Sequence, residues 1–229
     1  MSIVDILAIA AHPDDVEISC AGLLLRMADQ GYKTGVLDLT RGEMGTKGSA
    51  EIRDREAAAA ASIMGLSLRE NAGLPDSRLT LNDESRMLVA SCLRRLRPKV
   101  VVIPADGQRH PDHNAASEIA YAAIFVAGLS KFSADTPAHR PDKVLYTVSG
   151  QDRAPSFYVD ITDQMDRKLQ AVASYFSQFG TPNEPIYTAI ESWARSCGSR
   201  CGVRYAEGYF IKQSLLIGDP ISELRLNPV

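Results

Sequence analysis

The feature that most constrains the fold of this chain is a regular alternation of short apolar runs with longer segments of helical periodicity. The runs Ile6–Ala11, Thr34–Leu39 and Val100–Pro104 are mostly aliphatic and short enough to be strands. Strands that are buried on both faces read as such continuous runs, and the helices between them cover the two faces. The alternation therefore predicts a Rossmann-like α/β fold, with a mostly parallel sheet flanked by helices.

The rest of the chain continues this pattern. Two further strands are expected at residues 144–148 and 157–161, and helices at residues 17–30, 51–64, 84–96, 114–126, 162–176 and 185–196. A chain of 229 residues with no internal repeat or long linker can bury one sizeable core, so residues 1–229 are expected to form a single domain. Residues 128–141 contain two prolines and are expected to form a long surface loop or a lid.

Charge and apolar patterning exclude several classes of protein. The formal net charge is −3 and the basic residues are scattered, whereas a nucleic-acid binder concentrates them on one face. The first residues lack the basic start of a signal peptide, and no run of about 18 apolar residues is present. We therefore expect a cytoplasmic protein with reduced cysteines that binds neither nucleic acid nor membranes. Cys197 and Cys201 have no further zinc-type ligands nearby, which favours a packing role over a metal site.

Two polar clusters directly follow two of the predicted strands. The sequence His12-Pro13-Asp14-Asp15 comes after the first strand, and the segment Asp106–His113 comes after Val100–Pro104. Three of the four histidines of the chain lie in these clusters. Open parallel sheets bind ligands beyond the carboxyl ends of their strands. Both clusters are therefore expected to face one crevice.

Histidine and aspartate are ligands that zinc accepts, and a catalytic zinc takes three protein ligands and keeps one position for water. The clusters hold more such residues than three. A hydrolase needs the extra groups, because a carboxylate must take a proton from the water and a donor must stabilise the developing oxyanion. The structural alternative is that each His-Pro-Asp sequence forms a turn that caps a helix. Two clusters at equivalent strand ends favour the metal site over two unrelated turns.

The clusters resemble the signature of the LmbE-like (PIG-L) family of zinc-dependent N-deacetylases, which has His-Pro-Asp-Asp near the N-terminus and His-Pro-Asp-His further along the chain. Other segments are also similar to that family, namely Leu39–Thr46, Arg53 with Glu56, Gly73–Leu79 and Gly202–Tyr209. The resemblance covers about the whole chain. Its nearest branch is that of the bacillithiol-biosynthesis deacetylases, which act on N-acetylglucosaminyl-malate.

The resemblance implies a ligand set for the metal. It makes His12, Asp15 and His113 the ligands of one Zn²⁺ ion per chain. Iron(II) or another divalent ion suits the same three ligands. The resemblance also implies a homo-oligomer, and relatives of this type form hexamers.

The resemblance assigns catalytic roles to other members of the clusters. It makes Asp14 the general base, His110 the protonated partner of the tetrahedral intermediate, and Asp112 the residue that orients His110. Other branches of the family place a tyrosine, an oxyanion donor, where this chain has Gln108. Bacillithiol-type relatives offer a tyrosine from their C-terminal region instead, where this chain has Arg195-Ser196-Cys197. The identity of a second oxyanion donor therefore stays open.

Four residues are candidates for substrate binding. Arg53 and Asp76 match family positions that hold sugar hydroxyls, and Glu43 lies in a matching glycine-rich loop. Their alternatives are an ordinary helix-surface ion pair, a turn residue and a solvated side chain, respectively. Arg109 lies inside the second cluster and can bind a carboxylate with two hydrogen bonds, which suits a malate group. Its alternative is an ion pair with an aspartate of the same loop.

The predicted function is hydrolysis of the acetamide of an N-acetylglucosamine conjugate, with N-acetylglucosaminyl-malate as the first candidate. Three alternatives are a deacetylase of another sugar conjugate, a nucleotide-binding module and a non-catalytic sugar or metal binder. A nucleotide-binding module predicts Gly-x-Gly-x-x-Gly after the first strand, where His12–Asp15 stands instead. A non-catalytic binder would lack a base, whereas Asp14 is present.

Overall fold

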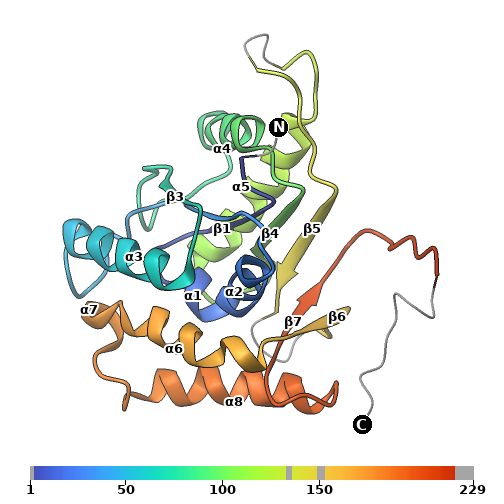
Figure 1. The fold of residues 1–229 in the computed structure, drawn as a ribbon. Helices are drawn as coiled ribbons and strands as arrows, with labels where there is room; N and C mark the ends of the chain where they lie inside the picture. The colour runs from blue at the N-terminus through green and yellow to red at the C-terminus, as the bar shows by residue number, and fades with distance from the viewer. Residues whose placement is uncertain (1–2, 133–135, 149–152, 220–229) are drawn as a thin grey trace.

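The computed structural model describes residues 3–132, 136–148 and 153–219, and it contains a seven-stranded sheet (Figure 1). The strands lie in the order β3-β2-β1-β4-β5-β7-β6. The first five are mutually parallel, whereas β7 is antiparallel to both β5 and β6. Their bounds are β1 Ile6–Ala10, β2 Thr34–Asp38, β3 Leu68–Asn71, β4 Val100–Pro104, β5 Lys143–Thr147, β6 Phe157–Asp160 and β7 Ala206–Phe210. The expectation of a mostly parallel α/β sheet is confirmed.

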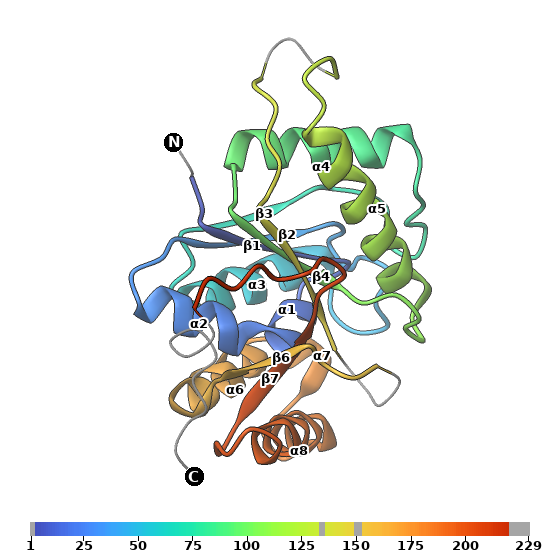
Figure 2. The same ribbon diagram turned by 90° about the vertical axis from the view of Figure 1, so that its right-hand side faces the viewer.

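Helices cover both faces of this sheet (Figure 2). Helices α4 and α5 lie on one face, and α1, α2 and α3 lie on the other, with α6 and α8 beyond them. The helices are α1 Asp15–Ser19, α2 Ala21–Asp29, α3 Ala50–Met64, α4 Asp83–Leu96, α5 Pro111–Ala127, α6 Met165–Ala173, α7 Phe176–Phe179 and α8 Pro185–Ser199. Within the described ranges, no helix has both the length and the apolar composition needed to cross a bilayer.

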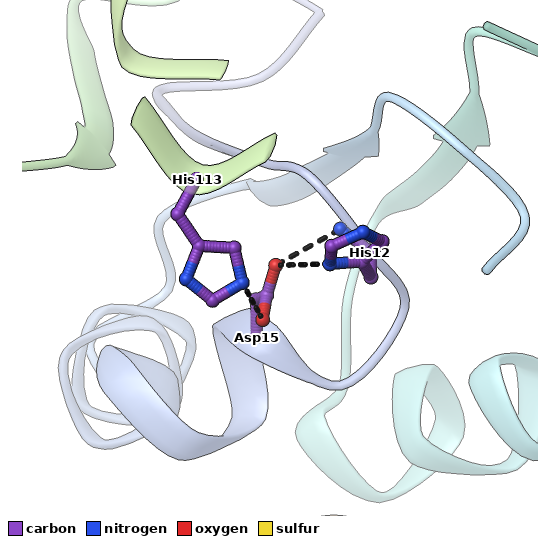
Figure 3. Close-up of side chains that lie close together, drawn as sticks. All are labelled: His12, Asp15 and His113. Carbon is purple, nitrogen blue, oxygen red and sulfur yellow. Dashed lines mark hydrogen bonds and ion pairs between the residues drawn. The ribbon is translucent and has the colours of Figure 1, made fainter. Parts of the chain in front are cut away.

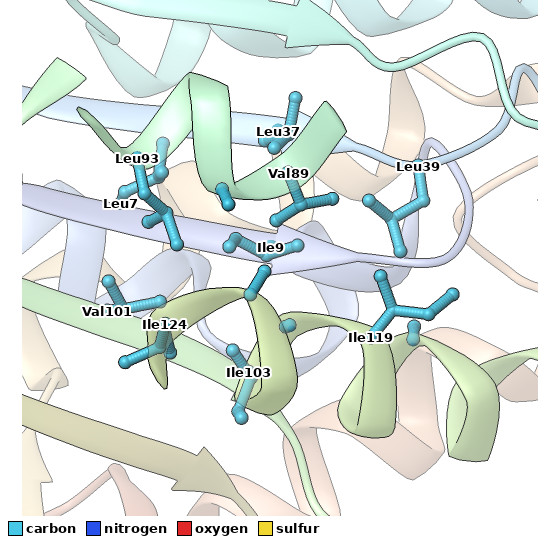
Figure 4. Close-up of a cluster of buried hydrophobic side chains, with 14 of the residues drawn as sticks. Leu7, Ile9, Leu37, Leu39, Val89, Leu93, Val101, Ile103, Ile119 and Ile124 are labelled. Carbon is cyan, nitrogen blue, oxygen red and sulfur yellow. The ribbon is translucent and has the colours of Figure 1, made fainter. Parts of the chain in front are cut away.

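The side chains of strand β1 alternate between the two faces of the sheet, so β1 contributes to the core on both sides. Leu7 and Ile9 are fully buried against α4 and α5 (Figure 4), in a cluster that includes Leu93. Ala8 and Ala10 face the opposite way and pack in the cluster formed with α1, α2 and α3. A strand buried on both faces has no exposed polar positions, which explains the continuous apolar run in the sequence.

The structure differs from the sequence prediction in the helix expected at residues 17–30. This helix is interrupted at Cys20, whose φ and ψ are −144° and 15°, so that α1 ends at Ser19 and α2 begins at Ala21. The break gives α2 its own N-terminus. There the backbone N–H groups of Gly22 and Leu23 donate to the carboxylate of Glu207 in β7, at 2.9 and 2.8 Å.

Glu207 is the centre of a buried polar group. Besides the two N–H groups of α2, its carboxylate accepts hydrogen bonds from Lys168 at 2.5 Å and from the hydroxyl of Tyr209 at 2.6 Å. Both Glu207 and Lys168 are buried. The strand that carries Glu207 was not predicted, because a glutamate in a short polar segment does not resemble a buried strand. The helix expected at residues 162–176 was also too long, since a 3₁₀ turn (Thr162–Gln164), α6 and α7 share that region.

Residues 128–141 were expected to form a long surface loop or a lid, and the described part is a loop without helix or strand that lies away from the crevice. The imidazole Nε2–H of His139 donates to the carbonyl of Pro98 at 2.7 Å, and Pro98 lies just before β4. Arg94 of α4 donates to the carbonyl of Thr136 at 2.8 Å. These contacts hold the segment at the amino ends of the strands, whereas both polar clusters lie at the carboxyl ends.

Candidate metal centre

Three histidines meet beyond the carboxyl ends of β1 and β4, which are neighbours in the sheet. His12 follows β1, and His110 and His113 stand at the start of α5. The ring centroid of His12 lies 5.0 Å from that of His110 and 5.5 Å from that of His113. The structure thus brings the two sequence clusters together as expected.

The carboxylate of Asp15 lies between two of these rings (Figure 3). Its Oδ2 is 3.4 Å from Nδ1 of His12, and its Oδ1 is 3.1 Å from Nε2 of His113. One donor atom from each of the three residues lies within 4.8 Å of the others. Two imidazole nitrogens and one carboxylate oxygen form a donor set that zinc and iron(II) accept. These residues therefore fit a divalent metal ion.

The electrostatics of the centre also favour a cation. Burial opposes the charged form of His12, but its hydrogen bond to Asp15 and the charges of Asp15, Asp76 and Asp14 raise its pKa to about 9. Burial likewise opposes ionisation of Asp15, but hydrogen bonds with the two histidines hold its pKa well below the usual range. A group of carboxylates that holds a proton so firmly on imidazole will also attract a divalent ion.

His12 is oriented by two buried carboxylates on the side away from Asp15. Oδ1 of Asp76 lies 3.1 Å from Nε2 of His12, and Oδ2 of Asp112 lies 3.5 Å from the same atom. The other oxygen of Asp76 accepts the backbone N–H of Met44 at 2.8 Å. A carboxylate on the outer nitrogen of a ligating imidazole fixes its tautomer and leaves the inner nitrogen for the metal. Asp76, expected at a sugar hydroxyl, thus has both oxygens engaged inside the protein.

His113 is oriented by Gln108, whose Oε1 lies 2.9 Å from Nδ1 of His113. The amide group of Gln108 is itself fixed, because its Nε2 donates to the carbonyl of Ala105 at 3.1 Å. An amide oxygen only accepts, so Nδ1 of His113 donates to it, and Nε2 faces Asp15 as the candidate ligand atom. Sequence reasoning treated Gln108 only as a missing tyrosine. The sequence signal for its role as a hydrogen-bond partner of His113 was its position, five residues before that histidine at the start of a helix.

Asp14, the expected base, lies beside the candidate ligand Asp15. It is the N-cap of α1, with φ of 115° in the region that only glycine adopts freely, and it is 9% exposed. Arg53 donates to its Oδ2 at 2.7 Å and also to the carbonyl of Pro13. Burial and the charge of Asp15 raise the pKa of Asp14 well above its usual value, and Arg53 opposes this effect. Arg53, expected at the substrate, thus contacts Asp14, and a contact with substrate stays a prediction.

The surroundings of His110 oppose its charged form. Its Nδ1 accepts the backbone N–H of Asp112 at 3.2 Å, which leaves the proton of the neutral ring on Nε2. Burial and the neighbouring rings of His113 and His12 lower the pKa of His110. The carboxylate of Asp112 accepts the backbone N–H of Ser77 at 2.7 Å and approaches His12. Nε2–H of His110 is therefore available to donate, and the hydrogen bond between Asp112 and His110 comes from the backbone N–H of Asp112.

The two remaining candidates have different environments. Glu43 accepts the backbone N–H groups of Asp76 and Arg41 at 2.8 and 3.2 Å, so it braces the turn that carries Asp76. Arg109 is exposed at the edge of the centre. The described residues show no cysteine in a possible metal group, and Cys197 and Cys201 are free thiols. Glu43 thus contacts the turn of Asp76, whereas Arg109 is exposed, and substrate binding by either residue stays a prediction.

Comparison with known proteins agrees with this geometry. The profile of the PIG-L family, described as GlcNAc-PI de-N-acetylase, matches residues 7–124. A diacetylchitobiose deacetylase from Thermococcus kodakarensis is 30% identical over 223 residues, which cover 89% of this chain and 81% of that protein. The chain belongs to the PIG-L family. Membership of the PIG-L family confirms the expected enzyme class, a metal-dependent deacetylase.

Solved structures support the same PIG-L assignment. A conserved protein from Thermus thermophilus is 42% identical, with a TM-score of 0.88 over 93% of this chain and 97% of that chain. An N,N'-diacetylchitobiose deacetylase from Pyrococcus horikoshii is 27% identical, with a TM-score of 0.82 over 96% of this chain and 88% of that chain. The whole described fold is thus that of PIG-L proteins.

Proposed function

We propose that this enzyme removes the acetyl group from an N-acetylglucosamine conjugate that carries a carboxylate, such as N-acetylglucosaminyl-malate of bacillithiol biosynthesis. The observation that carries this proposal is the free guanidinium of Arg109, directly before His110. Nearby carboxylates have other partners: Asp106 pairs with Arg153 at 2.8 Å, and Asp112 lies among the groups of the metal centre. Among the described residues, no ion pair involves Arg109, so a carboxylate of the substrate can bind it.

The residues of the centre divide the proposed reaction among them. When bound, a zinc or iron(II) ion lowers the pKa of a coordinated water and polarises the acetyl carbonyl. Asp14 takes the proton of the attacking water, and Arg53 holds its carboxylate in place. Nε2–H of His110 donates to the oxygen that becomes negative in the tetrahedral intermediate. Asp14 then passes its proton to the departing amine, so that acetate and a free amino sugar result.

The substrate proposal is tested by comparing kcat/KM on N-acetylglucosaminyl-malate with kcat/KM on plain N-acetylglucosamine. We expect the malate conjugate to be hydrolysed faster, and Arg109→Ala to remove most of that preference. Because the guanidinium is exposed, we expect a loss of roughly 10- to 100-fold, the range for a hydrogen bond to a charged group. Arg109→Lys is the matched control, which retains the charge without the two-pronged geometry. Equal losses on both substrates in Arg109→Ala would show that Arg109 only supports the loop.

A second candidate is a neutral N-acetylated sugar, which the similarity to diacetylchitobiose deacetylase favours. It predicts that N,N'-diacetylchitobiose is hydrolysed faster than the malate conjugate and that Arg109→Ala changes neither rate. We also propose that the enzyme is a cytoplasmic homo-oligomer, with a hexamer as the expected state. Light scattering of the purified protein tests the oligomer.

A further inference from the structure

A cavity of about 190 Å³ lies beside the candidate metal ligands, and we call it the inner cavity. Asp15, His113 and Gln108 of the centre form part of its wall. The rest of the wall comes from α1 and from the carboxyl halves of β1, β4 and β5, with the side chains of Val16, Val102 and other apolar residues. Because two of the candidate ligands line it, this space adjoins the candidate metal centre.

The inner cavity has the wrong chemistry for a sugar. Apart from the groups of the metal centre, its side chains are aliphatic or are the small side chains of Ser19, Cys20 and Thr147. Each sugar hydroxyl that leaves water needs a hydrogen-bond partner, and its burial without one is costly. An apolar chain loses nothing in such a space and gains from leaving water. The lining thus fits the acyl side of the substrate amide rather than its sugar side.

The size of the inner cavity exceeds the need of an acetyl group. An apolar cavity of roughly 150 Å³ is large enough to bind benzene, which has six carbons. Acetyl presents a single methyl group beyond its carbonyl. The volume of about 190 Å³ therefore has room for an acyl chain of about six carbons.

A second cavity lies next to the inner cavity. It has a volume of about 280 Å³, and it shares Ile18 and Ser19 with the inner cavity as common walls. Its other side chains include Ile190 and Trp193 of α8. The charged side chains at its edge, Lys168 and Glu207, are paired with each other at 2.5 Å and demand no partner from a ligand. The space beyond Ser19 thus also accepts apolar groups.

We propose that this enzyme binds and hydrolyses N-acyl amino sugars whose acyl chain has four to six carbons, with the chain in the inner cavity. The reaction is the same amide hydrolysis: water supplies a hydroxyl to the acyl carbon and a proton to the nitrogen, and a carboxylate and an amine leave. Turnover of these substrates rests on the proposed deacylase function. Binding of the acyl chain rests on the inner cavity alone.

The binding experiment uses the acyl products as probes. The zinc-loaded enzyme is titrated calorimetrically with acetate, butanoate and hexanoate. A fully buried methylene adds about fourfold in affinity, so we expect hexanoate to bind at least tenfold more tightly than acetate. Equal affinities for the three carboxylates in the wild-type enzyme would overturn the proposal, whatever the turnover results.

A pair of variants at Ser19 locates the binding site. Ser19→Phe places a large side chain between the two cavities, and we expect it to remove most of the gain of hexanoate over acetate. Ser19→Ala is the matched control, because it deletes only the hydrogen bond from the Ser19 hydroxyl to the carbonyl of Asp15, 2.7 Å long, and leaves the space open. An unchanged gain in a folded Ser19→Phe would place the chain elsewhere and overturn the proposal.

Turnover of N-acetyl, N-butanoyl and N-hexanoyl forms of one glucosamine conjugate separates the two proposals. We expect kcat/KM for the hexanoyl form to be at least equal to that for the acetyl form, and this ratio to fall tenfold or more in Ser19→Phe but not in Ser19→Ala. Hydrolysis of the acetyl form alone would overturn the inference about chain length and leave the deacetylase function intact. Tighter binding of hexanoate without turnover of any amide would overturn the function and leave the acyl site intact.

Discussion

Replacing Gln108 by leucine tests how His113 is directed at the metal. Leucine has a similar size but no acceptor, so Nδ1–H of His113 loses its partner at 2.9 Å. The ring then samples the other tautomer and other orientations, in which Nε2 no longer points to the metal. Loss of such an outer partner typically weakens metal binding 10- to 100-fold. We therefore expect the Kd for zinc to rise by that factor, which is about 1.4–2.7 kcal/mol.

The assay is competition for zinc against a chelating dye, with folding checked by circular dichroism. Gln108→Glu is the matched control, because its carboxylate also accepts from Nδ1–H and we expect it to keep the wild-type affinity within about threefold. Asn114→Ala tests the loop itself, since Asn114 holds the backbone N–H of Gln108 at 2.8 Å. Wild-type zinc affinity in a folded Gln108→Leu protein would refute the reasoning that this amide orients the ligand.

The remaining predictions concern the metal, the base and acid stability. His113→Ala should lose most of the one divalent ion expected per chain, and full occupancy by elemental analysis would refute its role as a ligand. Asp14→Asn should keep the metal but lower kcat by on the order of 10² or more, as for a lost general base, so normal turnover with metal bound would rule out that role. Burial lowers the pKa of His139 below its usual value of 6.5, and the hydrogen bond to Pro98 only partly opposes this shift. The unfolded chain then binds a proton at higher pH than the folded one, so the free energy of unfolding falls as the pH drops below about 6.5. Urea titrations of the metal-free protein at pH 7.5 and pH 5 should show a smaller fall for His139→Gln than for the wild type, and an equal fall would contradict the assigned shift.

The sequence was sufficient to predict the meeting of the two clusters. His12 and His113 follow apolar runs that read as neighbouring parallel strands, and the carboxyl ends of such strands share one edge. The residues that orient these ligands were not predictable in the same way. Asp76 reaches His12 across 64 positions of the chain, through a turn braced by Glu43. Sequence spacing carries no information about such a contact, because it depends on how two loops pack.

The unpredicted elements have a common physical origin in buried polar side chains. Strand β3 carries Arg69, which pairs at 2.5 Å with the buried Glu17 and at 2.7 Å with Asp38, and β7 carries Glu207. Read alone, such charged residues indicate solvent exposure, because their partners lie far away in the sequence. The break at Cys20 has the same source. Glycine at position 22 allows the carboxylate of Glu207 to approach the start of α2, because a Cβ there would lie 2.6 Å from Ile161 and 2.8 Å from Glu207.

The bond between Glu207 and the start of α2 bears on how the protein is made. A ribosome releases every metal ligand and most of the sheet well before residue 207, because the two ends of this contact are 185 positions apart. At 5–20 residues per second, the growing chain spends roughly 10–40 seconds without the acceptor of the first N–H groups of α2, which bond to water meanwhile. A fragment that stops near residue 124 would carry both polar clusters but would lack Glu207 and the elements that pack on α2 after it. The segment that best identifies this protein by sequence therefore lacks part of what holds α2 in place, and we expect truncations that remove β7 to destabilise the start of that helix.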